Sequence, residues 1–106
     1  MTAKLVVLYP HPIDVSAFER AYHAQHMPLM RRFINPPERV PTYRVLGGSS
    51  TPFYRMAEVH FASSQELRDF FASPNGEEAR VSSERLSSGG RPTYFVCEAD
   101  EQPWAR

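Results

Sequence analysis

The segment from residue 14 to residue 29 constrains the fold of this chain most, because it predicts a helix with one face that must be buried. Asp14 is placed to cap the start of this helix. At 100° per residue, one arc about 80° wide carries the side chains that should pack against a sheet. These residues are Val15, Phe18, Tyr22 and His26. Pro28 lacks an N–H donor and clashes with the preceding turn, so we expect a kink beside His26.

Short apolar runs around this helix predict four strands, at residues 3–9, 42–46, 53–62 and 92–98. The first run ends at Pro10-His11-Pro12, which neither a helix nor a central strand accepts. In the third run, alternation separates one face with Ala57, Val59 and Phe61 from a second face with Tyr54, Met56, Glu58 and His60. Ser63 and Glu66 predict the start of a second helix, and residues 77–86 predict a weaker helical stretch.

The order strand, helix, strand, strand, helix, strand predicts an α+β fold of one domain spanning residues 1–106. It matches a ferredoxin-like βαββαβ sandwich, in which helices cover one face of a four-stranded antiparallel sheet. The other face of the sheet, which should carry Tyr54, Met56 and His60, then stays uncovered, and an apolar face of that size is unfavourable in water. We therefore predict a homodimer that pairs the two open sheet faces.

The balance of charge limits the partners of this chain. Its 12 basic residues are matched by 12 acidic ones, so nothing favours a nucleic-acid or membrane partner. Aromatic residues make up 12% of the chain, enough to wall an apolar pocket or to fill a subunit interface. Cys97 is the only cysteine, which excludes an intrachain disulfide and predicts a cytoplasmic location. A small apolar or aromatic molecule, or another protein, is the expected partner.

Two groups of residues resemble the EthD family. The first follows Tyr9-Pro10-His11-Pro12 with the spacing Phe-x3-Tyr-x3-His-x-Pro-Leu, from Phe18 to Leu29. The second consists of Glu58-Val-His-Phe61, Ser63-Ser-Gln-Glu-Leu67 and Ser73-Pro-Asn-Gly76. The resemblance covers nearly the whole chain and implies a dimeric α/β barrel, in which two ferredoxin-like subunits join their sheets.

The resemblance also implies a range of chemistry. Dimeric α/β barrels include aromatic-substrate monooxygenases, lactone isomerases, polyketide cyclases and haem enzymes. EthD itself is associated with bacterial degradation of fuel ethers beside a cytochrome P450 system, and fungal relatives with modification of aromatic polyketides. A cofactor-independent monooxygenase, isomerase or decarboxylase acting on a small aromatic, polyketide or ether-like compound is therefore implied. Position 23 is often aromatic in relatives, whereas His23 stands here.

His26 and Tyr22 are the predicted catalytic pair, in a pocket between the first helix and the sheet. An imidazole on the buried arc can exchange a proton near neutral pH, and Tyr22 could orient it or polarise a substrate carbonyl. The alternative is that His26 only bonds a backbone carbonyl freed by Pro28. The predicted substrate-binding residues, which ordinary core packing would also explain, are His11, Phe18, Leu29, Tyr43, Phe61 and Phe95.

Two alternatives to a cofactor-independent enzyme remain open. Glu19, His23 and His26 lie within an arc of about 60° and could bind a metal, or His26 alone could ligate a haem. The second alternative is a non-catalytic ligand-binding or assembly partner of an oxygenase system. A cavity of about 300 Å³ beside His26 would favour an enzyme, and a packed interior would favour this binding protein.

Overall fold

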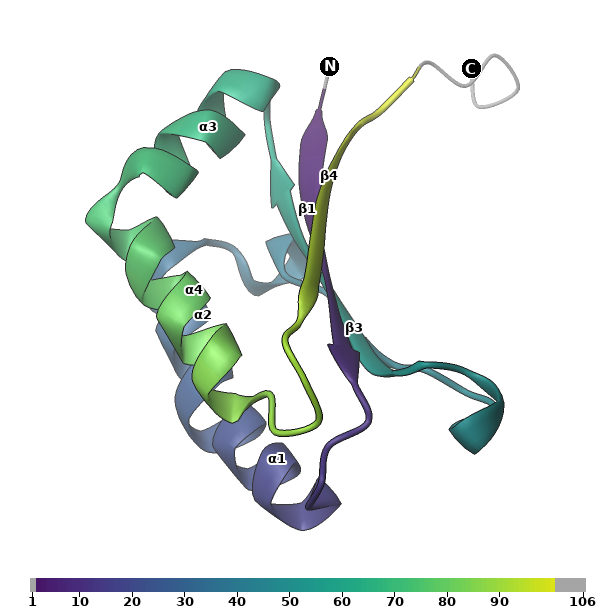
Figure 1. The fold of residues 1–106 in the computed structure, drawn as a ribbon. Helices are drawn as coiled ribbons and strands as arrows, with labels where there is room; N and C mark the ends of the chain where they lie inside the picture. Colours follow the sequence, from purple (N-terminus) through teal and green to yellow (C-terminus); the bar gives the residue numbers. More distant parts are fainter. Residues whose placement is uncertain (1, 101–106) are drawn as a thin grey trace.

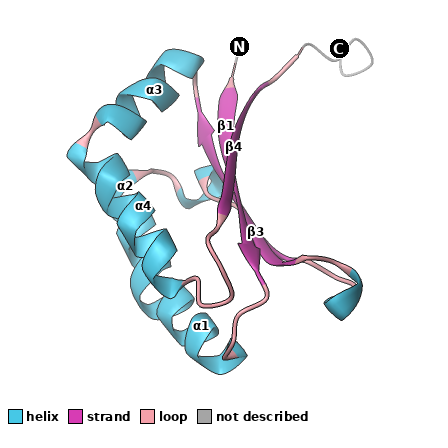
Figure 2. Ribbon diagram, viewed as in Figure 1, coloured by secondary structure: helices cyan, strands magenta, loops and turns pink. Residues whose placement is uncertain are grey.

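The computed structural model describes residues 2–100, so the ends of the predicted domain lie outside the described residues. A four-stranded antiparallel sheet forms one layer, and the long helices pack on one of its faces (Figures 1 and 2). The strands, in the spatial order β2-β3-β1-β4, are β1 (Ala3–Pro10), β2 (Thr42–Arg44), β3 (Phe53–Phe61) and β4 (Thr93–Glu98). The predicted α+β, ferredoxin-like fold is confirmed.

The helical layer contains α1 (Val15–Ala21), a π-helical turn (Tyr22–His26), α2 (Met27–Phe33), α3 (Ser64–Ala72) and α4 (Pro74–Leu86). The predicted N-caps are present, because Asp14 accepts a hydrogen bond from the Ala17 N–H and Ser63 accepts one from the Glu66 N–H. The weak helical stretch starts earlier than predicted. Ser73 caps it through the Gly76 N–H, and Pro74 stands in its first turn, where no N–H donor is needed.

The disturbance expected beside His26 takes the form of a π-helical turn. The Met27 N–H bonds to the carbonyl of Tyr22, five residues back. This turn contains one residue more than an α-helical turn. The angular positions of side chains around the helix, calculated at 100° per residue, therefore no longer hold after Tyr22. Phe18, Tyr22 and His26 are buried as predicted. Val15 is 48% exposed, because α1 begins beyond the end of the sheet (Figure 1).

A bulge in β3 places Tyr54 on the opposite face of the sheet from the one predicted. Tyr9 pairs with Arg55 and Pro10 pairs with Phe53, so Tyr54 is an extra, unpaired residue. The bulge turns Tyr54 toward the helices, where its ring meets the ring of Phe18 edge-on at 5.6 Å. The prediction that Tyr54 lies on the open face was therefore wrong.

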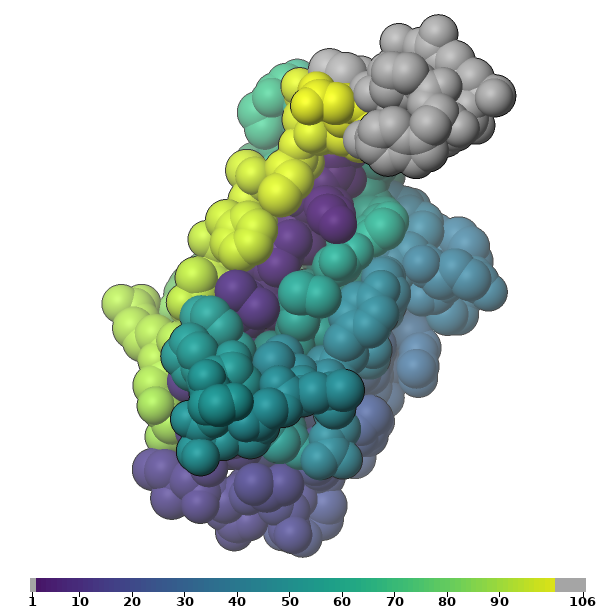
Figure 3. Space-filling view, turned by 90° about the vertical axis from the view of Figure 1, so that its right-hand side faces the viewer, coloured from purple at the N-terminus to yellow at the C-terminus, as the bar shows by residue number. Residues whose placement is uncertain are grey.

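The open face of the sheet carries no helix, and β4, β1, β3 and β2 lie side by side across it (Figure 3). The strand register shows which apolar residues lie on the open face. Leu5 and Val7 of β1 line the cavity, so the β1 residues that alternate with them, and the residues paired with those, face the open side. These apolar residues are Val6, Leu8, Tyr43, Met56 and Phe95. The turn between β2 and β3 projects from this side of the molecule (Figure 1). Within the described residues, no helix has the length and hydropathy needed to cross a membrane.

Candidate functional site

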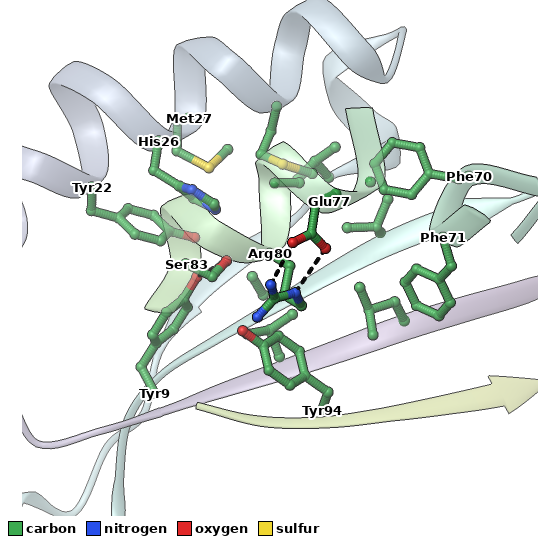
Figure 4. A pocket seen from close by; sticks show the side chains of 18 residues that line it. Tyr9, Tyr22, His26, Met27, Phe70, Phe71, Glu77, Arg80, Ser83 and Tyr94 are labelled. Atoms are coloured by element: carbon green, nitrogen blue, oxygen red, sulfur yellow. Dashed lines mark hydrogen bonds and ion pairs between the residues drawn. The ribbon is translucent and has the colours of Figure 1, made fainter. Parts of the chain in front are cut away.

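A cavity of about 280 Å³ lies between the helical layer and the sheet (Figure 4). Its walls are mainly apolar and come from β1, β3, α2 and the neighbouring ends of α3 and α4. Its polar lining residues are Tyr9, Tyr22, His26, Glu77, Arg80, Ser83 and Tyr94. The volume is close to that of the smaller ligand sites in proteins. A small, largely apolar molecule with one or two polar groups fits this lining.

His26 projects from the π-helical turn into the wall of this cavity (Figure 4). Its Nδ1 lies 2.9 Å from the hydroxyl oxygen of Ser82 on α4. The described residues give Nε2 no hydrogen-bond partner. Burial lowers the pKa of His26 from 6.5 to about 4, so the ring is neutral at pH 7. One ring nitrogen is therefore held by Ser82, and the other is free to accept or donate a proton.

Tyr22 contributes its ring to the wall of the cavity beside His26, with 5.5 Å between the ring centroids. Its hydroxyl lies 2.6 Å from the Thr42 hydroxyl at the start of β2. Burial raises the pKa of Tyr22, which keeps this hydroxyl protonated. The arrangement therefore suits Tyr22 to orienting the imidazole, since its hydroxyl is already engaged.

A polar cluster around Arg55 holds Tyr22 from the side away from the cavity. The guanidinium carbon lies 4.6 Å from the centre of the Tyr22 ring, within the range of a cation–π contact. Its Nη2 donates to both carboxylate oxygens of Glu19, at 3.1 and 3.2 Å, and Nη1 donates to Thr42 at 3.1 Å. Arg55 is 4% exposed. It was not among the residues that we selected from the sequence, although it is in phase with the buried Ala57.

Two tyrosines supply neutral hydroxyls to the cavity lining. The Tyr9 hydroxyl donates to Ser83 at 3.0 Å, and burial raises the pKa of both Tyr9 and Tyr94. At the rim, Arg80 forms an ion pair with Glu77 (Figure 4). It forms a second ion pair with Glu84. Glu84 also pairs with Arg91, so these charges compensate one another and the cavity offers hydrogen bonds more than net charge.

The predicted wall residues lie elsewhere in the structure. Phe18 and Phe61 are fully packed core, at 3% and 2% exposure, and Leu29 borders a groove on the outer surface. Tyr43 and Phe95 lie on the open face of the sheet. His11 is exposed, and its Nε2 lies 2.7 Å from the Thr51 carbonyl oxygen. Of the predicted site residues, the structure brings only Tyr22 and His26 together around the cavity.

The polar lining residues that the sequence analysis missed come mainly from α4 and β4, apart from Tyr9 of β1. The mixed charges of residues 77–86 indicated only a solvated face. The available signal was the pair of small residues Ala79 and Ser83, one helical turn apart, which form the buried side of α4. On β4 the sequence analysis selected Phe95, but successive strand residues face opposite sides and Tyr94 is the one that lines the cavity.

The three residues of the metal hypothesis do not converge. The His23 Nε2 lies 3.1 Å from Glu19, which also binds Arg55, whereas His26 turns toward Ser82. Residues 2–100 contain no group of three or more histidine, cysteine or carboxylate side chains placed to hold a metal ion. The arc of about 60° that would bring these three residues together was calculated for a regular α-helix, and the extra residue in the π-helical turn breaks that regularity.

Comparison with known proteins places this chain among described relatives. The family model described as the EthD domain matches residues 10–88. A curated protein from Rhodococcus erythropolis, described as an uncharacterized 11.0 kDa protein in the thcB-thcC intergenic region, is 30% identical over 102 residues. That match covers 94% of this chain and 98% of the relative.

Solved structures repeat the fold. An EthD family protein from Bacillus halodurans is similar at a TM-score of 0.80 and 24% identity, over 94% of this chain and 100% of that one. A dimeric ferredoxin-like protein of unknown function from Jannaschia matches at 0.68 and 14% identity, over 93% and 100%. SnoaB from Streptomyces nogalater, a cofactor-independent oxygenase, matches at 0.60 and 12% identity, over 96% and 95%.

Proposed function

This chain belongs to the EthD domain family, and we propose that it is an enzyme that uses His26 as an acid–base group on a small aromatic or ether-like molecule. The observation that carries the proposal is the position of His26 in the cavity wall, with Nδ1 bonded to Ser82 and Nε2 free. A neutral imidazole is the form that can take a proton from a substrate, and burial keeps His26 in that form at pH 7. The cofactor-independent chemistry of the structurally similar SnoaB is compatible with it.

The cavity also suggests the class of substrate. Most of its lining is apolar, and its neutral hydroxyls can bond a phenol, ether or carbonyl oxygen. Aromatic rings such as Tyr22 and Phe70 can pack against a flat substrate. We therefore propose a mono- or bicyclic aromatic compound with one or two oxygen substituents, processed without a bound cofactor.

Replacing His26 with Gln should abolish the acid–base reaction, since general acid–base catalysis contributes on the order of 100-fold to 10,000-fold to rate. A panel of mono- and bicyclic phenols would be incubated with the protein in D₂O, with ring deuterium uptake measured by NMR and oxidised products by mass spectrometry. The exposed His23 provides the matched control, His23→Gln, which should retain the wild-type rate.

A His26→Gln variant with the full wild-type rate would refute the assignment of His26. Saturable phenol binding without exchange or product in the wild type would instead favour a ligand-binding protein that serves an oxygenase. A metal analysis and an absorbance scan of the purified protein address the metal and haem alternatives.

We further propose that two copies form a homodimer through their open sheet faces, as the description of the similar Jannaschia protein suggests. Tyr43 and Phe95 are each nearly half exposed there, and Leu46, near the projecting turn, is 87% exposed. Sheet pairing would remove this apolar surface from water and leave the helical layer with its cavity outside.

Replacing Phe95 with Glu should convert the dimer to monomers, because it would bury a carboxylate without a partner at the interface. Light scattering coupled to size exclusion would measure the change from about twice the chain mass of 12.1 kDa. Ile13, in the loop between β1 and α1, is 84% exposed. Ile13→Glu is therefore a control that should stay dimeric. A Phe95→Glu protein that remains dimeric would contradict an interface on this face.

A further inference from the structure

Ser82 stands between the internal cavity and the outer surface of the helical layer. On one side, its hydroxyl oxygen lies 2.9 Å from Nδ1 of His26, whose ring borders the cavity. On the other side, Ser82 borders a groove between α4 and the segment that runs from the π-helical turn into α2. The groove is open to solvent, and Gln25 lines it together with Ser82.

The Ser82 hydroxyl is the single hydrogen-bond partner of the His26 ring among residues 2–100. The other hydroxyls near the ring are committed elsewhere, since Tyr22 bonds Thr42 and Tyr9 bonds Ser83. His26 itself is only 5% exposed. When a ligand fills the cavity, the route from His26 to water that does not pass the ligand therefore runs through Ser82.

We propose that Ser82 relays protons between Nδ1 of His26 and water in the outer groove, so that Nε2 can be reset while the cavity is occupied. The inference rests on the acid–base role of His26 proposed above. When Nε2 takes a proton from a substrate, the Nδ1 proton passes to the Ser82 oxygen and the original hydroxyl proton passes to water. One proton leaves the substrate and one reaches solvent, and the imidazole ends neutral in its other tautomer. The reverse sequence delivers a proton to a product.

The chemistry of both groups suits this relay. A serine hydroxyl can accept one hydrogen bond and donate another at the same time. A neutral imidazole does the same through its two nitrogens. Burial disfavours a charged imidazolium in this wall, as the lowered pKa of His26 indicates. A relay that removes one proton as another arrives avoids forming that charge.

The test is the rate at which the Nδ1–H of His26, the ring proton that faces Ser82, exchanges with water, measured by NMR on protein labelled with ¹⁵N-histidine. Ser82→Ala removes the hydroxyl from a half-buried position of α4, and alanine is well tolerated in helices. The exchange rate at His26 should fall by about tenfold or more, and the ring nitrogen shifts should report a changed tautomer ratio. Ser82→Thr keeps the hydroxyl and should restore wild-type exchange.

Gln25→Ala changes the same groove without touching a hydrogen bond of His26 and should leave its exchange unchanged. Exchange in Ser82→Ala that equals or exceeds the wild-type rate would overturn the relay, as would failure of Ser82→Thr to restore it in a folded protein. The measurement uses the free protein and needs no substrate. Loss of the relay is thus distinguished from failure of the acid–base role, which the His26→Gln assay reports.

Discussion

Lowering the pH from 6.5 to about 4 should reduce the free energy of unfolding by about 3 kcal/mol more in the wild-type protein than in His26→Gln. The sign follows from burial, which lowers the folded-state pKa of His26 to about 4 from its ordinary 6.5. Between these values, the unfolded chain binds a proton at His26 and the folded protein does not. Acid therefore favours the unfolded state across this window, and the contribution of His26 is fully present only above pH 6.5.

Urea denaturation followed by far-UV circular dichroism, at steps from pH 4 to pH 8 and one protein concentration, would measure this difference. The rest of the chain is identical in the two proteins, so other effects of pH largely cancel in the comparison. Parallel stability curves for the two proteins would show that His26 is not held neutral by burial.

The layered fold was predictable because its signals are local and agree with one another. The apolar run of β1, the Asp14 cap and the Ser63 cap each depend on neighbours within a few residues. Together they give the order of strands and helices, and the hand of βαβ connections leaves few ways to assemble them. The EthD resemblance pointed to the same arrangement.

Departures from regular geometry were not predictable in the same way. The π-helical turn before Pro28 and the bulge at Tyr54 each insert one residue into a regular period. The bulge moves Tyr54 to the opposite face from the one assigned by that period, whereas Met56 and His60 keep the assigned face. A proline indicates that a helix is disturbed but does not specify how its hydrogen bonds rearrange.

The candidate site was predicted only for residues on its first helix. His26 and Tyr22 lie on one buried arc, which periodicity detects, whereas Ser82, Ser83 and Tyr94 approach them through tertiary packing. Aromatic composition led to Phe18 and Phe61 as wall residues, yet the same hydrophobicity makes them core. Single-residue properties do not separate a packed ring from one that borders a cavity.

Replacing Arg55 with Met should lower the free energy of unfolding by about 3 kcal/mol at pH 7, since removing one partner of a buried ion pair leaves the other without compensation. Burial alone would raise the pKa of Glu19, but hydrogen bonds from Tyr54 and Arg55 outweigh it and lower that pKa. The Glu19 carboxylate keeps some contact with water, so the loss should lie at the low end of such effects. Arg80→Met removes an arginine from exposed ion pairs and should change stability little.

A double-mutant cycle would identify what Arg55 supports. If its main partner is Glu19, the Glu19→Gln, Arg55→Met protein should be more stable than the sum of the single changes predicts, by about 1–3 kcal/mol. If its contact with the Tyr22 ring at 4.6 Å dominates, the two changes should add, and Tyr22→Leu should couple to Arg55→Met instead. An Arg55→Met protein as stable as Arg80→Met would refute both. Because Tyr22 lies against His26, coupling through Tyr22 would make Arg55 a positioning residue for the cavity, whereas coupling through Glu19 would limit it to holding α1 on the sheet.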